Sequence, residues 1–407
     1  MDVVFGIDVS ENSSSVCELI GNSKNEFTIT NDRPRFFQLL KALKIFAQVP
    51  QIIFEATGVY SRRLQAFLDD YGYNYVVMNP LKAKKEMNQG LRHNKTDKND
   101  AYHLALIERL HRHPVNQKQT EGDRRLYALS HFYDQLTTDV VSAKNRLHQA
   151  LQSSFPELEK LFCEAKGINY WKIVKYYPHC EDSRQTSEQD IITFLLKLKG
   201  ISNERSKKVA QNLIKLADTA YPAVGRNSIE VSQAKYYAQR LIDLDKQRKE
   251  LIDQMLKLAK NLPNNDLKKL ESIPGFGEIT AVKVLAELGD IRGFNNPNKI
   301  NAFIGIDPGR YQSGKMDFNL SITKHGNATA RKILYCAIGQ IDLAAKIIPC
   351  HIADYYESKK QYNQIKGFKK IAIASVHKLI RTIYALITKD QTYNYSLAIR
   401  NQKISCK

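Results

Sequence analysis

Four acidic residues occur where carboxylates from different structural elements could meet. Asp8 and Glu55 each come directly after a short apolar run that is typical of a strand, and Asp97 and Asp100 are three residues apart. That spacing places both on one face of a helix. Grouped carboxylates repel one another unless a cation neutralises them, and hard oxygen ligands suit Mg²⁺ or Mn²⁺. These acids therefore predict a metal site of the kind that promotes in-line attack on a phosphate.

Each of these acids, taken singly, has a simpler interpretation. Asp97 or Asp100 could cap a helix, and Asp8 could occupy a turn. The Gly-Ile-Asp sequence around Asp8 also resembles the phosphate loop of the actin-like sugar kinases and heat-shock ATPases, which would make the protein an ATP-dependent kinase. A second glycine-rich turn for adenosine is missing, however, and the second half of the chain is basic and helical. The metal site therefore remains our prediction.

The elements that position these acids follow from the first hundred residues. Three strand signals come first, and strand and helix signals then alternate, with the last strand ending before Asn79-Pro80. This order predicts a mixed sheet with helices on its faces and is the one used by the ribonuclease-H-like (RuvC-like) α/β fold. Acids that leave neighbouring strands of such a sheet face a shared crevice.

The middle of the chain predicts long helices. Apolar residues alternate in steps of three and four from Leu126 to Ala150 and again from Tyr237 to Leu262. Both series last for about four heptads, which favours a paired coiled coil, although two long helices buried in one bundle would give the same pattern. We place the domain boundaries at 1–115 for the RuvC-like domain, 116–265 for the coiled-coil and helical region, and 266–407 for a mainly helical C-terminal domain.

The C-terminal domain opens with a glycine-bearing turn before a helix. Gly275 and Gly277 lie in Ile273-Pro274-Gly275-Phe276-Gly277, a sequence typical of a helix-hairpin-helix motif. Free backbone N–H groups at a helix start favour a phosphate. A glycine turn used only for helix packing is the equally good alternative.

Composition and charge indicate which kinds of partner and cellular location the protein has. The 407 residues carry a net charge of +19, and the six cysteines are scattered without a Cys-x-x-Cys pair. Residues 1–107 have 13 basic and 12 acidic residues, whereas residues 271–407 have 20 and 10. This uneven excess indicates a polyanionic partner, most simply nucleic acid, although a lysine-rich surface is the alternative. The absence of a long apolar run argues against a membrane span, and no secretory signal is visible. The scattered cysteines fit a reducing cytoplasm, and we expect a cytoplasmic, nucleoid-associated bacterial protein.

Taken together, the motifs resemble the DEDD transposases of the insertion-sequence one-ten family. They fall in family order and span most of the chain: Gly6-Ile7-Asp8-Val9-Ser10, Glu55-Ala56-Thr57-Gly58, Lys95-Thr96-Asp97-Lys98-Asn99-Asp100, the Gly275 turn, Gln312-Ser313-Gly314 and Lys324-His325-Gly326-Asn327. The resemblance implies that Asp8, Glu55, Asp97 and Asp100 form a Mg²⁺-binding catalytic set. It implies that Ser313 is a catalytic serine that forms a covalent phosphoserine link to DNA.

The same resemblance implies the partners of the protein. They are donor and target double-stranded DNA, a structured guide (bridge) RNA, and further copies of this chain, which form a homodimer and then a homotetramer. The residues that we expect to contact nucleic acid are the two turn glycines and the basic residues beside the acids and the serine: Arg92, Lys95, Lys98, Gly275, Gly277, Arg310, Lys315, Lys324 and Arg331.

Ser313 alone would be interpreted as a turn residue, because its local sequence contains no visible base. Its neighbour Asp307 stands where many relatives have a neutral residue. Two other functions remain open: a RuvC-like junction nuclease that uses the carboxylates alone, and a non-catalytic nucleic-acid-binding protein.

Overall fold

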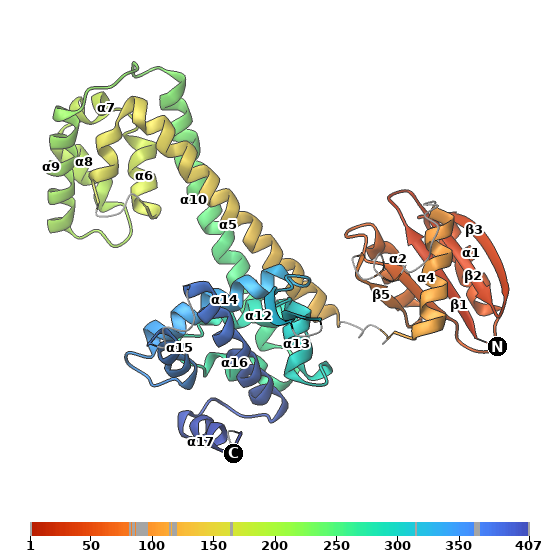
Figure 1. Cartoon of the computed structure of the whole chain (residues 1–407). Helices are drawn as coiled ribbons and strands as arrows, with labels where there is room; N and C mark the ends of the chain where they lie inside the picture. The colour runs from red at the N-terminus through yellow and green to blue at the C-terminus, as the bar shows by residue number, and fades with distance from the viewer. Residues whose placement is uncertain are drawn as a thin grey trace. The chain divides into compact units, whose positions relative to one another are not determined.

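The computed structural model of the chain contains two compact units, residues 1–118 and 119–407. The structure describes residues 2–80, 83, 86, 97–113, 115, 120–162, 166–313, 316–361 and 367–405. At 97, 98, 310, 311, 313, 316–320 and 401–405 the description is confined to the backbone. Figure 1 shows a mixed unit built on a sheet and a helical unit built on two long helices.

The first unit contains one five-stranded sheet. Its strands are β1 (Val3–Val9), β2 (Ser13–Ile20), β3 (Ser23–Thr30), β4 (Gln51–Glu55) and β5 (Val76–Met78), in the order β3-β2-β1-β4-β5. The first three pair antiparallel, whereas β1–β4 and β4–β5 pair parallel. All five expected strands are present, and the mixed α/β class is confirmed. The order agrees with a ribonuclease-H-like start.

Helices cover the two faces of this sheet separately. Helices α1 (Arg33–Lys44) and α2 (Ser61–Asp70) share a core with the odd-numbered residues of β1. Helix α4 (Asp97–His111) covers the opposite face, where its Leu104 belongs to a cluster with Val4 of β1 and Ile53 of β4. Because successive strand residues point to opposite faces, this division fixes the face on which each strand residue lies.

The second unit is organised around two long helices that lie side by side (Figure 1). Helix α5 (Glu121–Ser154) begins at a capping box formed by Thr120 and Asp123, and α10 (Ile229–Lys260) begins at Ser228. Most of the apolar residues predicted to lie along one face of α5, from Leu126 to Ala150, are buried. Arg248 interrupts the apolar series of α10, and its guanidinium donates a hydrogen bond of 2.8 Å to the Tyr133 hydroxyl of α5. Two paired helices are thus present, and their supercoiling stays a prediction.

Shorter elements complete the helical unit. One group lies between the two long helices in the sequence and at one end of them in Figure 1: η1 (Pro156–Lys160), α6 (Ile168–Tyr176), α7 (Cys180–Arg184), α8 (Glu188–Leu196) and α9 (Asn203–Thr219). The other follows α10: η2 (Pro263–Asn265), α11 (Asp266–Glu271), α12 (Glu278–Leu288), η3 (Ile291–Gly293), α13 (Pro297–Ile304), β6 (Pro308–Ser313), β7 (Met316–Ile322), α14 (Ala328–Ala344), α15 (His351–Gln361), α16 (Phe368–Thr388) and α17 (Tyr395–Ser405).

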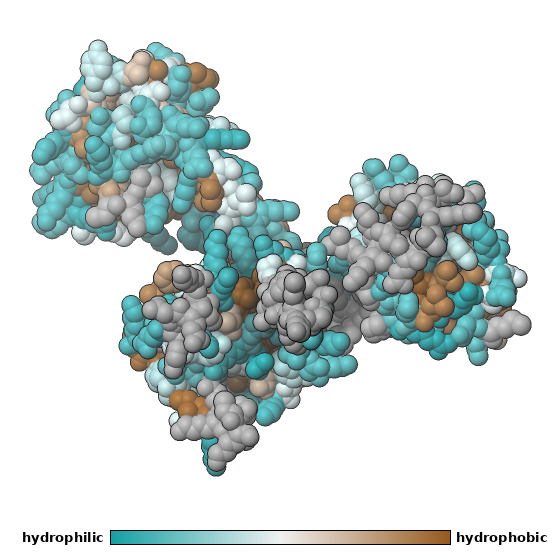
Figure 2. All heavy atoms as spheres, in the orientation of Figure 1, coloured by the Kyte–Doolittle hydropathy of each residue, from teal (hydrophilic) through white to brown (hydrophobic). Residues whose placement is uncertain are grey.

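Helix α16 is the one helix in the described ranges that is long and apolar enough to cross a membrane by length and composition. Half of its apolar stretch is buried, and Val376, Leu379 and Ile383 are fully enclosed in the core of the helical unit. This burial accounts for its apolar character. The described residues on the face shown in Figure 2 are mostly hydrophilic on both units.

Candidate active-site residues and nucleic-acid surface

Asp8 and Glu55 occupy equivalent positions on neighbouring parallel strands. The register pairs Ile7 with Phe54, the residues that directly precede the two acids. Ile7 and Phe54 are fully buried in the core under α1 and α2, so the acids that follow them belong to the opposite face. Adjacent strands are about 4.8 Å apart. The two half-buried carboxylates therefore share the face that α4 covers.

Gly6 brings α4 into direct contact with β1. A Cβ at this position would lie 2.1 Å from the Ala101 carbonyl oxygen and 2.6 Å from the Ala105 amide nitrogen. No side chain can occupy that space, so the helix backbone rests on the strand. Asp8 is the next residue on the same face of β1.

The direction of α4 decides which of its residues reach Asp8. Near the end of the helix, Arg109 donates a hydrogen bond to the Gly21 carbonyl, beside the β2–β3 turn. Just beyond it, Arg112 forms a 2.5 Å ion pair with Asp2, which precedes β1. Helix α4 therefore runs opposite to β1, and its first turn, with Asp97 and Asp100, lies toward the Asp8 end of the strand.

The fold thus brings the backbones of all four predicted acids to one end and one face of the sheet. Asp100 is half-buried there, and Asp97 is the first residue of α4. Within the described side chains, no group of three or more acids, histidines or cysteines is already close enough to hold one ion. The donor set consists of carboxylate oxygens alone, and this chemistry fits Mg²⁺ or Mn²⁺.

The basic residues predicted beside these acids are mostly beyond what the structure describes. Arg92 and Lys95 lie outside the described residues, and Lys98 is described only as backbone in the first turn of α4. Lys315 also lies outside them, and Arg310 is a backbone position in β6. Their contacts with nucleic acid stay predictions.

Ser313 lies at the end of a β-hairpin and not in an open turn. It is the last residue of β6 and pairs with Met316, the first residue of β7. Asp307 precedes the other end of β6, about 17–20 Å from Ser313 along an extended strand. The unusual acid is therefore close to the serine in sequence but distant from it in space. The alternation of apolar and polar residues from Met316 to Ile322 is the sequence signal that predicts a strand here.

The base of this hairpin is clamped by backbone contacts between Phe303–Asp307 and Thr323–Asn327. The Thr323 amide donates to the Asp307 carbonyl at 3.0 Å, and the Asn327 amide donates to the Phe303 carbonyl at 2.8 Å. At Gly326, which has φ 152°, a Cβ would lie 2.3 Å from the Phe303 carbonyl oxygen. The Gly326 motif therefore holds the hairpin to the end of α13.

Two predicted nucleic-acid contacts lie on this clamp. Arg331 donates a 2.6 Å hydrogen bond to the Ile304 carbonyl at the end of α13, so this nitrogen already stabilises the protein. Lys324 is exposed, and its backbone is left-handed, with φ 56°. Its amide donates to the Gly305 carbonyl at 3.0 Å. The backbone of Lys324 is thus fixed by the clamp, and its side chain is exposed to solvent.

Sequence reasoning missed a buried acid behind the clamp. The Asn327 side chain caps α14 through the Ala330 amide and donates to Glu287 of α12 at 2.7 Å. Glu287 is buried, and its other oxygen lies 2.9 Å from His131 Nε2 on α5. These contacts tie the hairpin base to two further helices. An asparagine directly before a helix was the only signal for them.

The two turn glycines differ in their surroundings. Gly275 has φ 82°, and a Cβ there would lie 2.5 Å from the Gln340 carbonyl of α14, which supports the packing interpretation. Gly277 is exposed, caps α12, and has nothing within 4 Å of a built Cβ. Gly277 therefore keeps the geometry expected of a phosphate contact, whereas Gly275 already has a structural role.

The four acids and Ser313 lie in regions of the chain that match models of known transposase families. A transposase family model, DEDD transposase IS110, matches residues 5–156, and the model of the IS116/IS110/IS902 transposase family matches residues 267–355. The first region contains all four acids and the second contains Ser313.

Individual relatives agree with these matches. The transposase for insertion sequence element IS1111A of Coxiella burnetii is 31% identical over 134 residues, which is 32% of this chain and 35% of that protein. The pilin gene-inverting protein of Moraxella bovis is 21% identical over 96% of this chain and 97% of its own length. A 44.8 kDa protein of insertion element IS116 from Streptomyces clavuligerus is 23% identical over 82% of this chain and 81% of its own length.

Proposed function

The chain belongs to the IS116/IS110/IS902 family of transposases, and from this premise we propose that it is an RNA-guided DNA recombinase with a serine nucleophile. The observation that carries the proposal is the convergence of Asp8, Glu55, Asp97 and Asp100 at one end of the sheet. Ser313, at the end of a clamped hairpin, supplies the second half of the proposed chemistry.

The four acids are the proposed ligands of Mg²⁺ or Mn²⁺. Such ions stabilise the charge that develops on the oxygens of a phosphate under attack. The strand ends hold Asp8 and Glu55 on rigid elements, and the first turn of α4 holds the other two. A set positioned in this way would hold the ions, and the ions would contact the DNA phosphate.

Ser313 is the proposed nucleophile. The Ser313 hydroxyl gives up its proton as Oγ forms a bond to phosphorus, the bond from phosphorus to a sugar oxygen breaks, and the leaving oxygen takes up a proton. The product is a phosphoserine link that a DNA hydroxyl can later attack to rejoin the strands. The reaction requires the acids and Ser313 to act on the same phosphate. We propose that assembly of the chain into a homodimer and then a homotetramer brings them together.

The proposed partners are donor DNA, target DNA and a structured guide RNA. Residues 271–407 carry 20 basic against 10 acidic residues. This excess of positive charge supports binding of a polyanionic partner by this part of the chain. The supercoiled pairing of α5 and α10, the helix-hairpin-helix motif, the ribonuclease-H-like class, the three domain boundaries and a nucleoid-associated cytoplasmic location belong to the same proposal.

The decisive experiment measures recombination between donor and target plasmids in the presence of Mg²⁺ and RNA that co-purifies with the protein. Asp8→Asn and Ser313→Ala should each abolish product, because one removes a metal ligand and the other removes the nucleophile. Ser321→Ala, an exposed serine on the same hairpin, is the matched control and should stay active.

A denaturing gel distinguishes the rival functions. The wild type should carry labelled DNA covalently, and Ser313→Ala should not. Strand cleavage that survives Ser313→Ala but is lost in Asp8→Asn would identify a carboxylate nuclease. Nucleic-acid binding without any Mg²⁺-dependent strand transfer would identify a binding protein. Sequencing the co-purified RNA tests guidance, since a discrete structured species is expected.

A further inference from the structure

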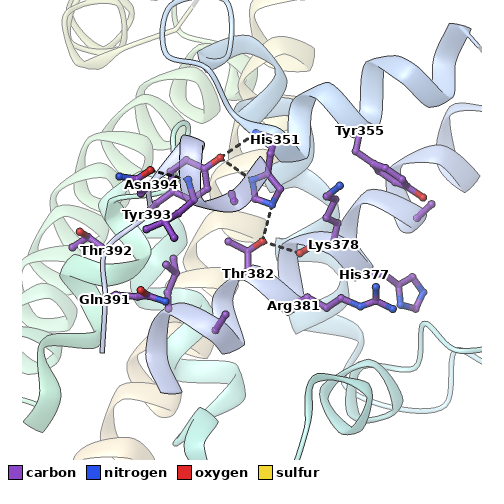
Figure 3. Close-up of a pocket in the computed structure, with 15 residues that line it drawn as sticks. His351, Tyr355, His377, Lys378, Arg381, Thr382, Gln391, Thr392, Tyr393 and Asn394 are labelled. Carbon is purple, nitrogen blue, oxygen red and sulfur yellow. Dashed lines mark hydrogen bonds between the residues drawn. The ribbon is translucent and has the colours of Figure 1, made fainter. Parts of the chain in front are cut away.

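A cavity of about 740 Å³ lies in the helical unit between α15, α16 and the segment Gln391–Asn394 that leads into α17. Figure 3 shows side chains of α16 on one side of it and those of this segment on the other. Its volume is within the range of about 300–1,000 Å³ that is typical of small-ligand sites. None of the predicted catalytic residues lines it.

Hydrogen bonds fix the shape of this cavity. The buried His351 imidazole lies with Nδ1 2.7 Å from the Tyr393 hydroxyl and Nε2 3.2 Å from the Thr382 hydroxyl (Figure 3). Thr382 donates its own proton to the Lys378 carbonyl, so it must accept from Nε2–H. Tyr393 then donates to Nδ1. This directed chain joins α15, α16 and the 391–394 segment.

The chemistry of the lining favours an anion with a flat apolar part. Lys378 and Arg381 are charged, and no acidic residue is among the described lining residues. The ring of Tyr355 forms an aromatic wall, with the Lys378 ammonium 4.7 Å from its centroid. Ala385 and Leu397 contribute apolar surface, and Asn394 contributes an amide.

The cavity adjoins the base of the Ser313 hairpin. His377, which lines it, lies beside the backbone of Ile306 and near the charge of Asp307. Ile306 and Asp307 lead directly into β6. The distance from there to Ser313 is about 20 Å at most, the length of six extended residues. A strand whose phosphate lies at Ser313 can therefore reach the cavity.

We propose that this cavity holds one unpaired nucleotide of the nucleic-acid substrate. Its phosphate lies against Lys378 and Arg381, and its base lies on the apolar surface beside Tyr355. Aromatic side chains beside basic groups are the usual arrangement for unpaired bases. The inference rests on the proposed function. It adds a site that binds an unpaired part of a nucleic-acid strand.

The test uses the full-length protein and a fluorescent duplex that contains one unpaired adenine, in DNA and RNA versions, beside the fully paired duplex. Arg381→Ala and Tyr355→Ala should each weaken binding of the unpaired form about tenfold. Binding of the paired duplex should change much less. Tyr355→Phe keeps the ring and should bind like the wild type.

The matched control is Lys389→Ala, which removes one exposed charge just after α16 and outside the cavity. Cross-linking by 5-iodouracil at the unpaired position should label the peptide that contains Tyr355 or Tyr393. The comparison of DNA with RNA identifies the strand that supplies the nucleotide.

Two failures are distinguishable. If the wild type binds neither duplex, the proposed function itself is wrong. If it binds both but Arg381→Ala and Tyr355→Ala behave like Lys389→Ala, only the cavity inference is overturned.

Discussion

The acid-bearing end of the sheet and the serine-bearing hairpin are positioned by different means. Asp8 and Glu55 leave central strands whose preceding residues, Ile7 and Phe54, are fully buried. Ser313 is the last residue of β6 in a two-stranded hairpin that is held at its base by backbone hydrogen bonds and by the close backbone contacts of Gly305 and Gly326. Core packing thus fixes the acids, whereas a local clamp fixes the serine. The two regions should therefore fail in different ways.

The largest effect is expected at Gly6. A valine there would overlap the backbone of α4 at Ala101, and the helix would have to move off the sheet. We expect Gly6→Val to lower the free energy of unfolding of the first unit by about 3 kcal/mol or more and to abolish recombination. Denaturant unfolding followed by circular dichroism measures this. Gly225→Ala, at a site with open space, is the control.

Gly326→Ala should break the clamp without unfolding the first unit. The added Cβ would lie 2.3 Å from the Phe303 carbonyl oxygen at a backbone φ of 152°. We expect a local loss of about 2–3 kcal/mol and loss of the covalent DNA adduct. Hydrogen exchange at the Thr323 and Asn327 amides should accelerate. Unchanged exchange would show that the hairpin does not depend on this contact.

Acid should destabilise the helical unit through His351. Burial, with the nearby Lys378 charge, lowers the pKa of His351 to about 4 from 6.5. The unfolded chain takes up this proton below about pH 6.5, whereas the folded unit resists it until about pH 4. Stability is therefore complete above pH 6.5 and falls as the pH approaches 4, by on the order of 3 kcal/mol. His351→Gln should flatten this part of the profile in pH-dependent unfolding.

A smaller effect separates the two capping asparagines. Asn327→Ala removes the cap of α14 and the donor to one oxygen of the buried Glu287, whereas Asn296→Ala removes only the exposed cap of α13. We expect the free energy of unfolding to fall by about 2 kcal/mol for Asn327→Ala and by about 1 kcal/mol for Asn296→Ala, as measured by thermal unfolding. Equal losses would show that the contact with Glu287 adds nothing to the hairpin base.

The sheet and its acids were predictable because their signals are local. Short apolar runs gave all five strands, and Asp8 and Glu55 follow two of them directly. The long helices around Leu136 and Leu244 were predictable for the same reason, since heptad spacing repeats along each one. The hairpin that carries Ser313 has a local signal only in β7, where apolar and polar residues alternate from Met316 to Ile322. β6 has no such alternation, and the hairpin's support comes from other elements.

The sequence by itself determined which residue types could do chemistry and the order of elements that carries them. Only the tertiary structure decided that α4 runs opposite to β1, that Gly6 allows its backbone to rest on the strand, and that Asp307 is remote from Ser313. Only it revealed the cavity beside Lys378 and Arg381. The physical reason is that periodicity and turn residues encode local conformation, whereas the contacts of Gly6, Gly326 and His351 join residues far apart in the chain.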